Sequence, residues 1–278
     1  MVYLVNGEMD DRISVTDRGF QYGDGLFETI ALSGGKLAFW WRHMARLLAG
    51  CQRLGIAAPA PDLLLAEARQ LCAHQDTGVL KIIISRASGG RGYQCAVPSS
   101  ANRVITLHPW PDYPPDFSNR GINVRICQTR LGINPALAGL KHLNRLEQVL
   151  ARQEWRDAGT TEGVMLDCHG HAIEGVMTNL FLVRDGQLWT PDLSNCGVTG
   201  IMREVVIEVA EAIDIPVNIG VIPESELYQA EAIFLTNAIA GLWPVKRLGQ
   251  QTMGRSRISQ RLNAGLHDKR REEALDVL

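Results

Sequence analysis

The feature that most constrains the fold of this chain is a proline-rich stretch near its middle, PWPDYPPDFSNRG at residues 109–121, which contains four prolines. Proline fixes φ and has no backbone N–H, so a stretch of this kind interrupts regular structure and is typical of a linker. The length of 278 residues favours about two domains. We therefore predict a smaller N-terminal α/β domain at 1–110, a linker at 111–121 and a larger C-terminal domain at 122–278.

Hydrophobic periodicity predicts both strands and helices in each half. The N-terminal half is expected to hold two strands within 18–40 and helices at 40–54 and 62–74, followed by two β-rich runs with a glycine-rich loop between them. The C-terminal half is expected to hold a strand after the linker, a helix reaching about residue 158, a three-stranded meander at 163–190, a helix at 200–213, and further strands before a charged helical tail. Strands and helices that group in this way indicate an α+β or mixed α/β fold. Because small-molecule pockets favour domain interfaces, we expect the active site in the cleft between the domains.

Composition narrows the range of partners. The net charge is −2 with mixed signs along the chain, which gives no electrostatic footprint for nucleic acid or for an anionic membrane. No run reaches the roughly 20 apolar residues of a membrane span. Six cysteines are scattered without a C-x-x-C pair, so neither a disulfide framework nor a zinc site is indicated. A small-molecule substrate and a cytosolic location follow as expectations.

Lys141 is the candidate for covalent chemistry. It is one of only five lysines, and it lies in an apolar stretch just before leucines at helical spacing. Burial disfavours the ammonium form, which would lower the lysine pKa and leave an amine that can attack a carbonyl. The alternative is a lysine at a helix start whose ammonium reaches solvent, and the local sequence does not separate the two.

Two other patterns have ordinary explanations. His169 and His171 could form a metal pair, but they lie in a turn signal without a third ligand, so we expect a surface turn and no metal site. Three glycines at 89–92 are not followed by G-K-[ST], so they do not form a Walker loop.

Six segments, taken in order along the chain, resemble those of the fold-type-IV pyridoxal-phosphate enzymes, and within that family those of the bacterial aminodeoxychorismate lyases. They are RGFQYGDGLFET (18–29), HMARL (43–47), SRASGGRGY (85–93), KHLNRLEQVLARQE (141–154), IEGVMTNLF (173–181) and GVTGIMRE (197–204). The resemblance implies the two-domain fold of that family and pyridoxal 5'-phosphate as cofactor, held in the interdomain cleft.

The resemblance also assigns cofactor contacts. Lys141 forms the Schiff base, and Glu174 pairs with the pyridine nitrogen. Arg46, whose guanidinium fork suits an anion, binds the phosphate together with the backbone N–H groups of Ile201 and Met202. Transaminases of this fold have a phosphate-binding threonine where this chain has Ala238, so Asn237 or Thr236 is expected to take over that contact, unless the backbone alone serves. Taken one at a time, these residues also fit a solvated arginine, a surface glutamate, and a plain helix start capped by Thr199.

On the substrate side, Arg91 matches an arginine that binds a substrate carboxylate in D-amino-acid transaminases. Tyr93 stands where those enzymes have histidine, and Phe27 where several transaminases have tyrosine. Without the resemblance, Arg91 could equally be an exposed loop residue. Part of this loop reaches the partner subunit's site in the resembling enzymes, which implies a homodimer.

The activity implied by the resemblance is cleavage of 4-amino-4-deoxychorismate to 4-aminobenzoate and pyruvate, a step of folate biosynthesis, with Lys141 as the base that removes the C4 proton. One alternative is transamination by a D-amino-acid or branched-chain aminotransferase of the same fold. The second is a binding or regulatory protein that has lost catalysis, against which Lys141, Arg46 and Glu174 argue because all three are present.

Overall fold

The computed structural model describes residues 2–96, 101–114, 116–157 and 159–277. Contacts divide the chain into two compact units. Unit 1 comprises Met1–Pro111, Lys141–Asn144 and Arg270–Leu278, and unit 2 comprises Asp112–Leu140 and Arg145–Lys269. Within the described residues, no helix combines the length and apolarity needed to cross a membrane.

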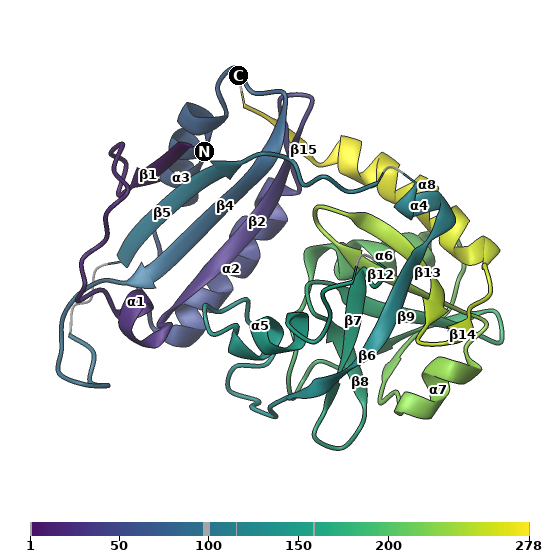
Figure 1. Ribbon diagram of the computed structural model, residues 1–278. Coiled ribbons are helices and arrows are strands. Elements are labelled where there is room, and N and C mark those ends of the chain that lie inside the picture. The colour runs from purple at the N-terminus through teal and green to yellow at the C-terminus, as the bar shows by residue number, and fades with distance from the viewer. Residues whose placement is uncertain (1, 97–100, 115, 158, 278) are drawn as a thin grey trace. The chain divides into compact units, whose positions relative to one another are not determined.

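In the part of the chain that the structure describes, unit 1 is built on an antiparallel sheet of six strands in the order β1-β5-β4-β2-β3-β15 (Figure 1). Its strands are β1 (Val2–Val5), β2 (Gly25–Ser33), β3 (Lys36–Ala38), β4 (Thr77–Arg86), β5 (Ala101–His108) and β15 (Ala274–Asp276). Its helices are α1 (Arg18–Tyr22), α2 (Trp40–Leu54) and α3 (Pro61–Cys72), of which α2 packs on β2 and α3 on β1 and β5. The last strand, β15, lies far along the chain from β1, so segments from the beginning and the end of the described residues belong to one sheet.

The helices α2 and α3 form where the periodicity predicts them. In α2 the buried side chains Trp40, Met44, Leu47 and Cys51 recur at helical spacing, and Gly55 ends the helix in the left-handed region at φ 64°.

The prediction of a strand at 18–22 was wrong, because these residues form α1. Its N-cap is Asp17, whose side chain accepts from the N–H of Phe20, and its C-cap is Gly23 at φ 67°. An aspartate before the helix and a glycine after it are the usual end signals of a helix, and they outweigh the strand-like composition between them.

Unit 2 contains a nine-stranded sheet, counted over the described residues, that closes on itself through pairing of β8 with β9. The closed part runs β9-β12-β13-β6-β7-β8, with β10 and β11 extending it beyond β9 and β14 pairing with β13. The strands are β6 (Ile122–Leu131), β7 (Glu162–Asp167), β8 (Ala172–Gly175), β9 (Asn179–Arg184), β10 (Gln187–Pro191), β11 (Val217–Gly220), β12 (Ala232–Asn237), β13 (Gly241–Leu248) and β14 (Gln251–Thr252). The predicted three-stranded meander is thus four strands, β7 to β10.

The helices of the second half are short apart from α6 and α8. They are α4 (Phe117–Arg120), α5 (Leu146–Arg152), α6 (Ile201–Ala212), α7 (Glu224–Gln229) and α8 (Arg257–Glu272). Helix α6 packs on β11 and β12, and α5 on β6 and β7. The main core of unit 2 is aliphatic with Trp243, against which Tyr113 and Phe117 pack edge-on. Mixed sheets with packed helices confirm the expected α+β, mixed α/β fold class.

The division of the chain into units differs in two places from the predicted 1–110, 111–121 and 122–278. Lys141–Asn144 count with unit 1 because their backbone pairs with β2, and Arg270–Leu278 do so because β15 pairs with β3. In the predicted linker, Phe117–Arg120 form α4, while Pro115 lies outside the described residues. The predicted limits of the two domains and of the linker therefore stay a prediction.

Candidate active site

The backbone around Lys141 is fixed against the start of β2. The N–H of Phe27 donates to the carbonyl of Lys141 at 2.9 Å, and the N–H of Leu143 donates to the carbonyl of Gly25 at 2.9 Å. A Cβ at Gly25 would lie 2.8 Å from Leu143 and 2.5 Å from the carbonyl of Ile84, so only glycine allows this close approach. Strand β2 therefore sets where Lys141 lies within unit 1.

The Lys141 side chain lies over an aromatic ring. Its Nζ is 4.3 Å from the ring centroid of Phe27, and Nζ of Lys81 is 5.3 Å from the same centroid. On β2 and β4 these half-buried residues alternate with fully buried ones, and Thr29 is opposite Lys81 in the antiparallel register. The Nζ atoms of Lys141 and Lys81 and an apolar ring thus share one region of unit 1.

Lys81 was not identified from the sequence, although a signal existed. In TGVLKIIISR it is a charged side chain within the apolar run from Val79 to Ile84, which makes a purely structural position unusual. The strand alternation places Lys81 on the same sheet face as Phe27.

Arg46 is held by a carboxylate within unit 1. Its Nε and Nη2 donate to Glu28 at 2.8 and 2.5 Å, and Nδ1 of His43 lies 2.6 Å from Glu28 Oε2. Burial alone would raise the pKa of Glu28, but the charges of Arg46 and His43 outweigh it and lower that pKa to about 2. For His43 the effect of burial is the larger one: it lowers the pKa of the imidazole, although the charge of Glu28 acts to raise it. The alternative of a solvated helix arginine does not hold for Arg46.

The side chains of Glu174 and Asn179 both hydrogen-bond to the backbone of Val198. Glu174 Oε2 accepts from the N–H of Val198 at 2.8 Å, and Asn179 Nδ2 donates to the carbonyl of Val198 at 2.8 Å. Both side chains are buried, so Glu174 is not the surface glutamate of the alternative interpretation. These contacts join the segments 173–181 and 197–204, which the resemblance had singled out separately. Asn179 was not identified from the sequence, because a single asparagine in a strand carries no chemical signal of its own.

Arg145 adds positive charge near this carboxylate. Burial lowers the pKa of Arg145, and the charge of Glu174 acts in the opposite direction. Arg145 Nη2 also donates to the carbonyl of Leu140 at 3.5 Å. Arg145 is therefore a positive charge that interacts electrostatically with Glu174.

The first turn of α6 begins at a glycine. Gly200 is the N-cap and provides no side-chain hydrogen bond, so the predicted alternative of a Thr199 cap is not what the structure has. The first-turn N–H groups of a helix need acceptors from outside the helix, and the dipole there favours an anion. A Cβ at Gly200 would lie 1.9 Å from Asn179 Oδ1, so the turn before Ile201 and Met202 closes only with glycine.

The side chain of Asn237 closes a turn. Its Oδ1 accepts from the N–H groups of Ile239 and Ala240, and its Nδ2 donates to the carbonyl of Met177 at 3.1 Å. The hydroxyl of Thr236 donates to the carbonyl of Gly241 at 2.7 Å. These hydrogen bonds give Asn237 and Thr236 a structural role. A phosphate contact by Asn237 stays a prediction.

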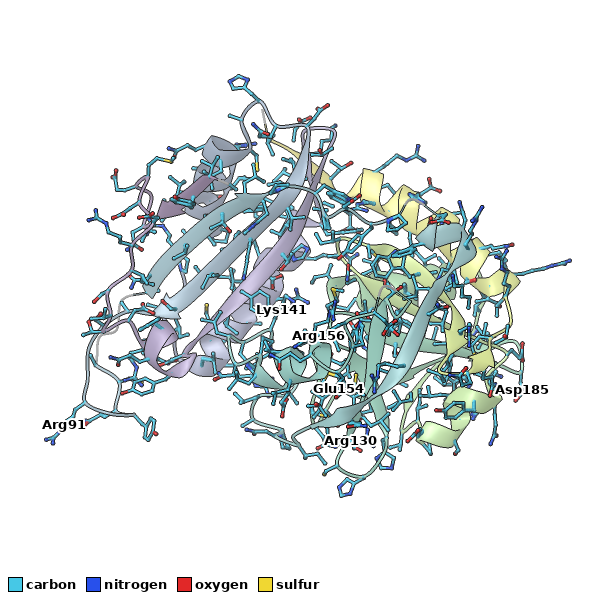
Figure 2. All side chains as sticks on the ribbon, in the orientation of Figure 1. Arg91, Arg130, Lys141, Glu154, Arg156 and Asp185 are labelled. Carbon is cyan, nitrogen blue, oxygen red and sulfur yellow. The ribbon has the colours of Figure 1, made fainter. Side chains whose placement is uncertain are left out.

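Arg91 and Tyr93 are brought together on an exposed loop of unit 1 but not with Lys141. The exposed fraction of Tyr93 is 86%, and Figure 2 shows Arg91 at the loop tip, directed away from the rest of unit 1 and well apart from Lys141. A role for either residue beside Lys141 of the same chain is therefore not supported by this arrangement.

The histidine pair forms a turn. Asp167 accepts from the backbone N–H groups of His169 and His171 and lies 3.1 Å from Nδ1 of His171. Among the described residues, no group of three or more His, Cys, Asp or Glu side chains could hold a metal ion.

Helix α5 differs from expectation in its length and its burial. It ends at Arg152, before the predicted residue 158, and its leucines point outward: Leu146 is 76% exposed and Leu150 is 55% exposed. The helical spacing was correct, but Leu146, Val149 and Leu150 on the apolar face are exposed.

Comparisons with known proteins show the family of this chain. A family model described as amino-transferase class IV matches residues 25–248. Aminodeoxychorismate lyase of Vibrio harveyi is 36% identical over 244 residues, covering 88% of this chain and 90% of that protein. The crystal structure of 4-amino-4-deoxychorismate lyase from Pseudomonas aeruginosa has a TM-score of 0.92 and 44% identity, covering 96% of this chain and 98% of that chain. Branched-chain-amino-acid aminotransferase of Escherichia coli K12 is 28% identical over 266 residues, covering 91% of this chain and 86% of that protein.

Proposed function

Since the chain belongs to the amino-transferase class IV family, we propose that it is a pyridoxal-phosphate-dependent lyase that converts 4-amino-4-deoxychorismate to 4-aminobenzoate and pyruvate. The observation that carries the proposal is the 44% identity, over 96% of the chain, to a structure of a lyase with this name. By comparison, the chain is 28% identical to the branched-chain-amino-acid aminotransferase of Escherichia coli K12, over 91% of its length. The substrate is thus a small molecule with an amine and two carboxylates.

The described residues fit the cofactor. The glycine-capped first turn of α6 offers the N–H groups of Ile201 and Met202 to a phosphate, and Glu174 offers a fixed carboxylate to a protonated ring nitrogen. In unit 1, Lys141 supplies the amine, and Arg46 supplies a guanidinium for the phosphate. Bound pyridoxal phosphate would supply an electron-withdrawing ring that takes up negative charge from the carbon beside the substrate nitrogen.

We assign the proton transfers to Lys141. Its Nζ removes the proton from C4 of the substrate, and the C3–O bond then breaks, so that the six-membered ring becomes aromatic. The same ammonium returns a proton to the departing enolpyruvate, which leaves as pyruvate. Atoms balance without any further reactant.

Lys81 extends the substrate side of the proposal. Its ammonium lies on the same Phe27 ring as that of Lys141, so it is placed to attract a substrate carboxylate, while the ring of Phe27 contacts the apolar part of the substrate. Arg91 and Tyr93 keep their predicted substrate role in this proposal, but toward a second copy of the chain.

We propose a homodimer on that basis. Arg91 and Tyr93 are exposed and lie apart from Lys141 of their own chain, and α5 presents Leu146, Val149 and Leu150 to solvent when one chain is considered alone. Contiguous exposed apolar side chains of this kind mark association surfaces. The cytosol is the proposed compartment, which is supported by six cysteines that are all free.

The test is an absorbance spectrum of the cofactor-loaded protein before and after addition of 4-amino-4-deoxychorismate, with pyruvate and 4-aminobenzoate measured in parallel. We expect the cofactor band of a lysine-bound pyridoxal phosphate and equal amounts of both products. A band without pyruvate, together with amino transfer to 2-oxoglutarate, would replace the lyase by an aminotransferase. Absence of any cofactor band would overturn the cofactor assignment.

A further inference from the structure

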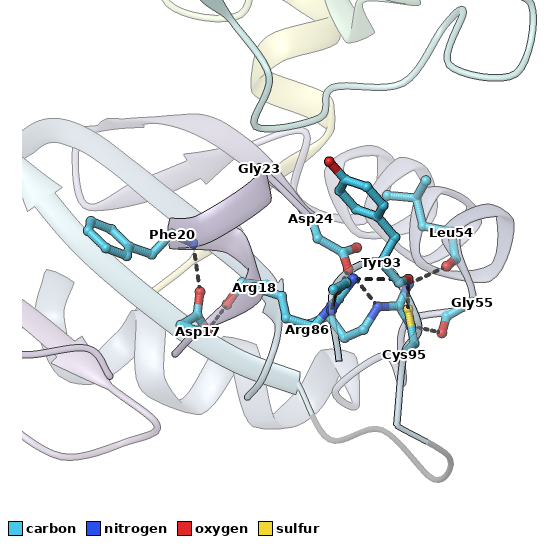
Figure 3. A network of polar contacts seen from close by, with 12 residues as sticks. Asp17, Arg18, Phe20, Gly23, Asp24, Leu54, Gly55, Arg86, Tyr93 and Cys95 are labelled. Atoms are coloured by element: carbon cyan, nitrogen blue, oxygen red, sulfur yellow. Dashed lines mark hydrogen bonds and ion pairs between the residues drawn. The ribbon is translucent and has the colours of Figure 1, made fainter. Parts of the chain in front are cut away.

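Arg18 is a buried cation that bonds to a distant loop. It lies on α1 with an exposed fraction of 5%, and its Nη1 and Nη2 donate to the carbonyls of Gly92 and Tyr93 at 2.8 and 3.4 Å. Its Nε donates to Asp24 Oδ2 at 3.0 Å (Figure 3). One guanidinium thus joins a carboxylate on one side to two adjacent loop carbonyls on the other, a geometry that its planar fork allows.

The carboxylate that holds Arg18 is itself anchored. Asp24 Oδ2 also accepts from Nε of Arg86 at 2.8 Å, and Arg86 donates its remaining bonds to the carbonyls of Leu54 and Gly55. The Arg18–Asp24–Arg86 network therefore ties the end of α2, the end of β4 and the loop to one point (Figure 3).

Helix α1 has a second anchor at its start. Asp17 is fully buried and accepts from the Ser85 hydroxyl and from Asn102 Nδ2, both at 2.7 Å. The helix is thus fixed to β4 and β5 independently of Arg18, so a change at Arg18 leaves the position of α1 defined.

The loop that Arg18 holds has a flexible composition. Gly89, Gly90 and Gly92 have positive φ values of 135°, 84° and 57°, and a Cβ at Gly90 would lie 1.9 Å from the carbonyl of Gln94. Glycines lose more backbone entropy on ordering than other residues, so a fixed loop of this kind depends on bonds from outside itself. Besides the hydrogen bonds from Arg18, the loop has an aromatic contact: the ring centroids of Tyr22 and Tyr93 are 5.5 Å apart.

We propose that Arg18 is a positioning residue for substrate binding, which fixes the loop 89–95 through the carbonyls of Gly92 and Tyr93 and so sets the direction of Arg91. The inference rests on the proposed function, because it takes Arg91 to bind a substrate carboxylate. Arg18 touches neither reacting atoms nor cofactor in this scheme. Loss of its two bonds therefore weakens substrate binding and leaves the chemical step in place.

The experiment compares Arg18→Met and Arg18→Lys with the cofactor-loaded wild-type protein. Hydrogen–deuterium exchange measures the amides of residues 89–95, and steady-state kinetics separates KM from kcat. For Arg18→Met we expect exchange in the loop and KM to rise by about tenfold each, the size of losing charge-assisted hydrogen bonds, with kcat and cofactor absorbance close to wild type. Arg18→Lys keeps the charge but loses the fork, so it should resemble Arg18→Met.

Arg86→Lys is the matched control, because Arg86 shares Asp24 but bonds to Leu54 and Gly55 and not to the loop. The substituted lysine can still pair with Asp24, so the bond between Arg18 and Asp24 stays in place and loop exchange should be unchanged. The proposal is overturned if Arg18→Met leaves loop exchange at the wild-type level, if exchange rises while KM does not, or if Arg18→Lys restores both. If the wild-type protein has no lyase activity, the proposed function fails, and loop exchange alone still decides whether Arg18 orders the loop.

Discussion

The backbone N–H of Val198 donates to Oε2 of Glu174 across 2.8 Å, so the carboxylate assigned to the cofactor ring is bonded to the turn that precedes α6. The same turn leads to the N–H groups assigned to the phosphate. The two ends of the proposed cofactor site in unit 2 are therefore one connected structure, and a change at either end should affect the other.

Glu174→Gln separates the charge of this carboxylate from its structural bond. The amide oxygen can still accept from Val198, so we expect the melting temperature and the cofactor affinity to stay near wild type. Removing the negative charge beside the ring nitrogen should lower kcat by roughly 10²–10³, the usual effect of losing one electrostatic group in an active site. Calorimetry, cofactor titration and steady-state kinetics measure the three quantities, and wild-type kcat would remove Glu174 from the mechanism.

Asn179→Ala should weaken cofactor binding with a smaller effect on chemistry. It deletes the bond to the part-buried carbonyl of Val198, which should raise the cofactor dissociation constant about tenfold. Asn218→Ala is the control, since the side chain of Asn218 is described only in a hydrogen bond to the side chain of Gln187. Equal dissociation constants for both variants would contradict the role given to Asn179.

Lys141→Ala should abolish the lysine-bound cofactor band and reduce turnover by at least about 10³-fold, because the residue is assigned both the covalent bond and the proton transfers. Lys246→Ala, which removes an exposed lysine, is the control and should behave as wild type. Turnover in Lys141→Ala comparable to that of Lys246→Ala would contradict the assignment.

Glu28→Gln should destabilise the protein at neutral pH, with a cost that shrinks in acid. The pKa of Glu28 is lowered from 4.5 to about 2, so its carboxylate stabilises the fold fully above about pH 4.5 and loses this effect as pH falls toward 2. The difference in free energy of unfolding between wild type and variant should thus fall by up to about 3 kcal/mol over that window. Urea unfolding at pH 7, 4 and 3 measures it, and a difference that does not change with pH would contradict the ionised Glu28.

Glu162→Gln should have the opposite pH dependence. Burial raises the pKa of Glu162 from 4.5 to about 7, against hydrogen bonds from Gly163, Val176, Met177 and Thr178 that would lower it. The folded state favours the protonated carboxyl, so wild-type stability is complete below about pH 4.5 and declines as pH rises through 7. The neutral glutamine avoids this decline, and the variant should gain up to about 3 kcal/mol relative to wild type between pH 4.5 and pH 8. Urea unfolding at pH 5 and pH 8 tests it, and parallel pH profiles would contradict it.

Local signals in the sequence predicted several elements well. Helix α2 matches its predicted range of 40–54 because apolar periodicity and a C-terminal glycine agree there. The order of six segments along the chain likewise sufficed for the family, which the comparisons show, whereas the roles of Lys141, Arg46 and Glu174 stay predictions.

What the sequence could not predict depends on contacts between distant residues. Periodicity places Leu146 and Leu150 on one helix face, but only the structure shows that this face is exposed. Nothing near Arg46 marks Glu28 as its partner, because the pair is made by the packing of α2 on β2. Nothing near Gly92 and Tyr93 marks Arg18, 74 residues before the first of them.

The sequence by itself determined the chemical groups available to this protein: a lysine in an apolar stretch, carboxylates, guanidinium groups, and glycines where the backbone must turn or approach closely. Tertiary structure alone decided which of these groups share a carboxylate, a carbonyl or a ring, as Lys141 and Lys81 share Phe27. The physical reason is range: conformational preferences act over a few residues, whereas burial and hydrogen bonding depend on which segments the sheets bring side by side.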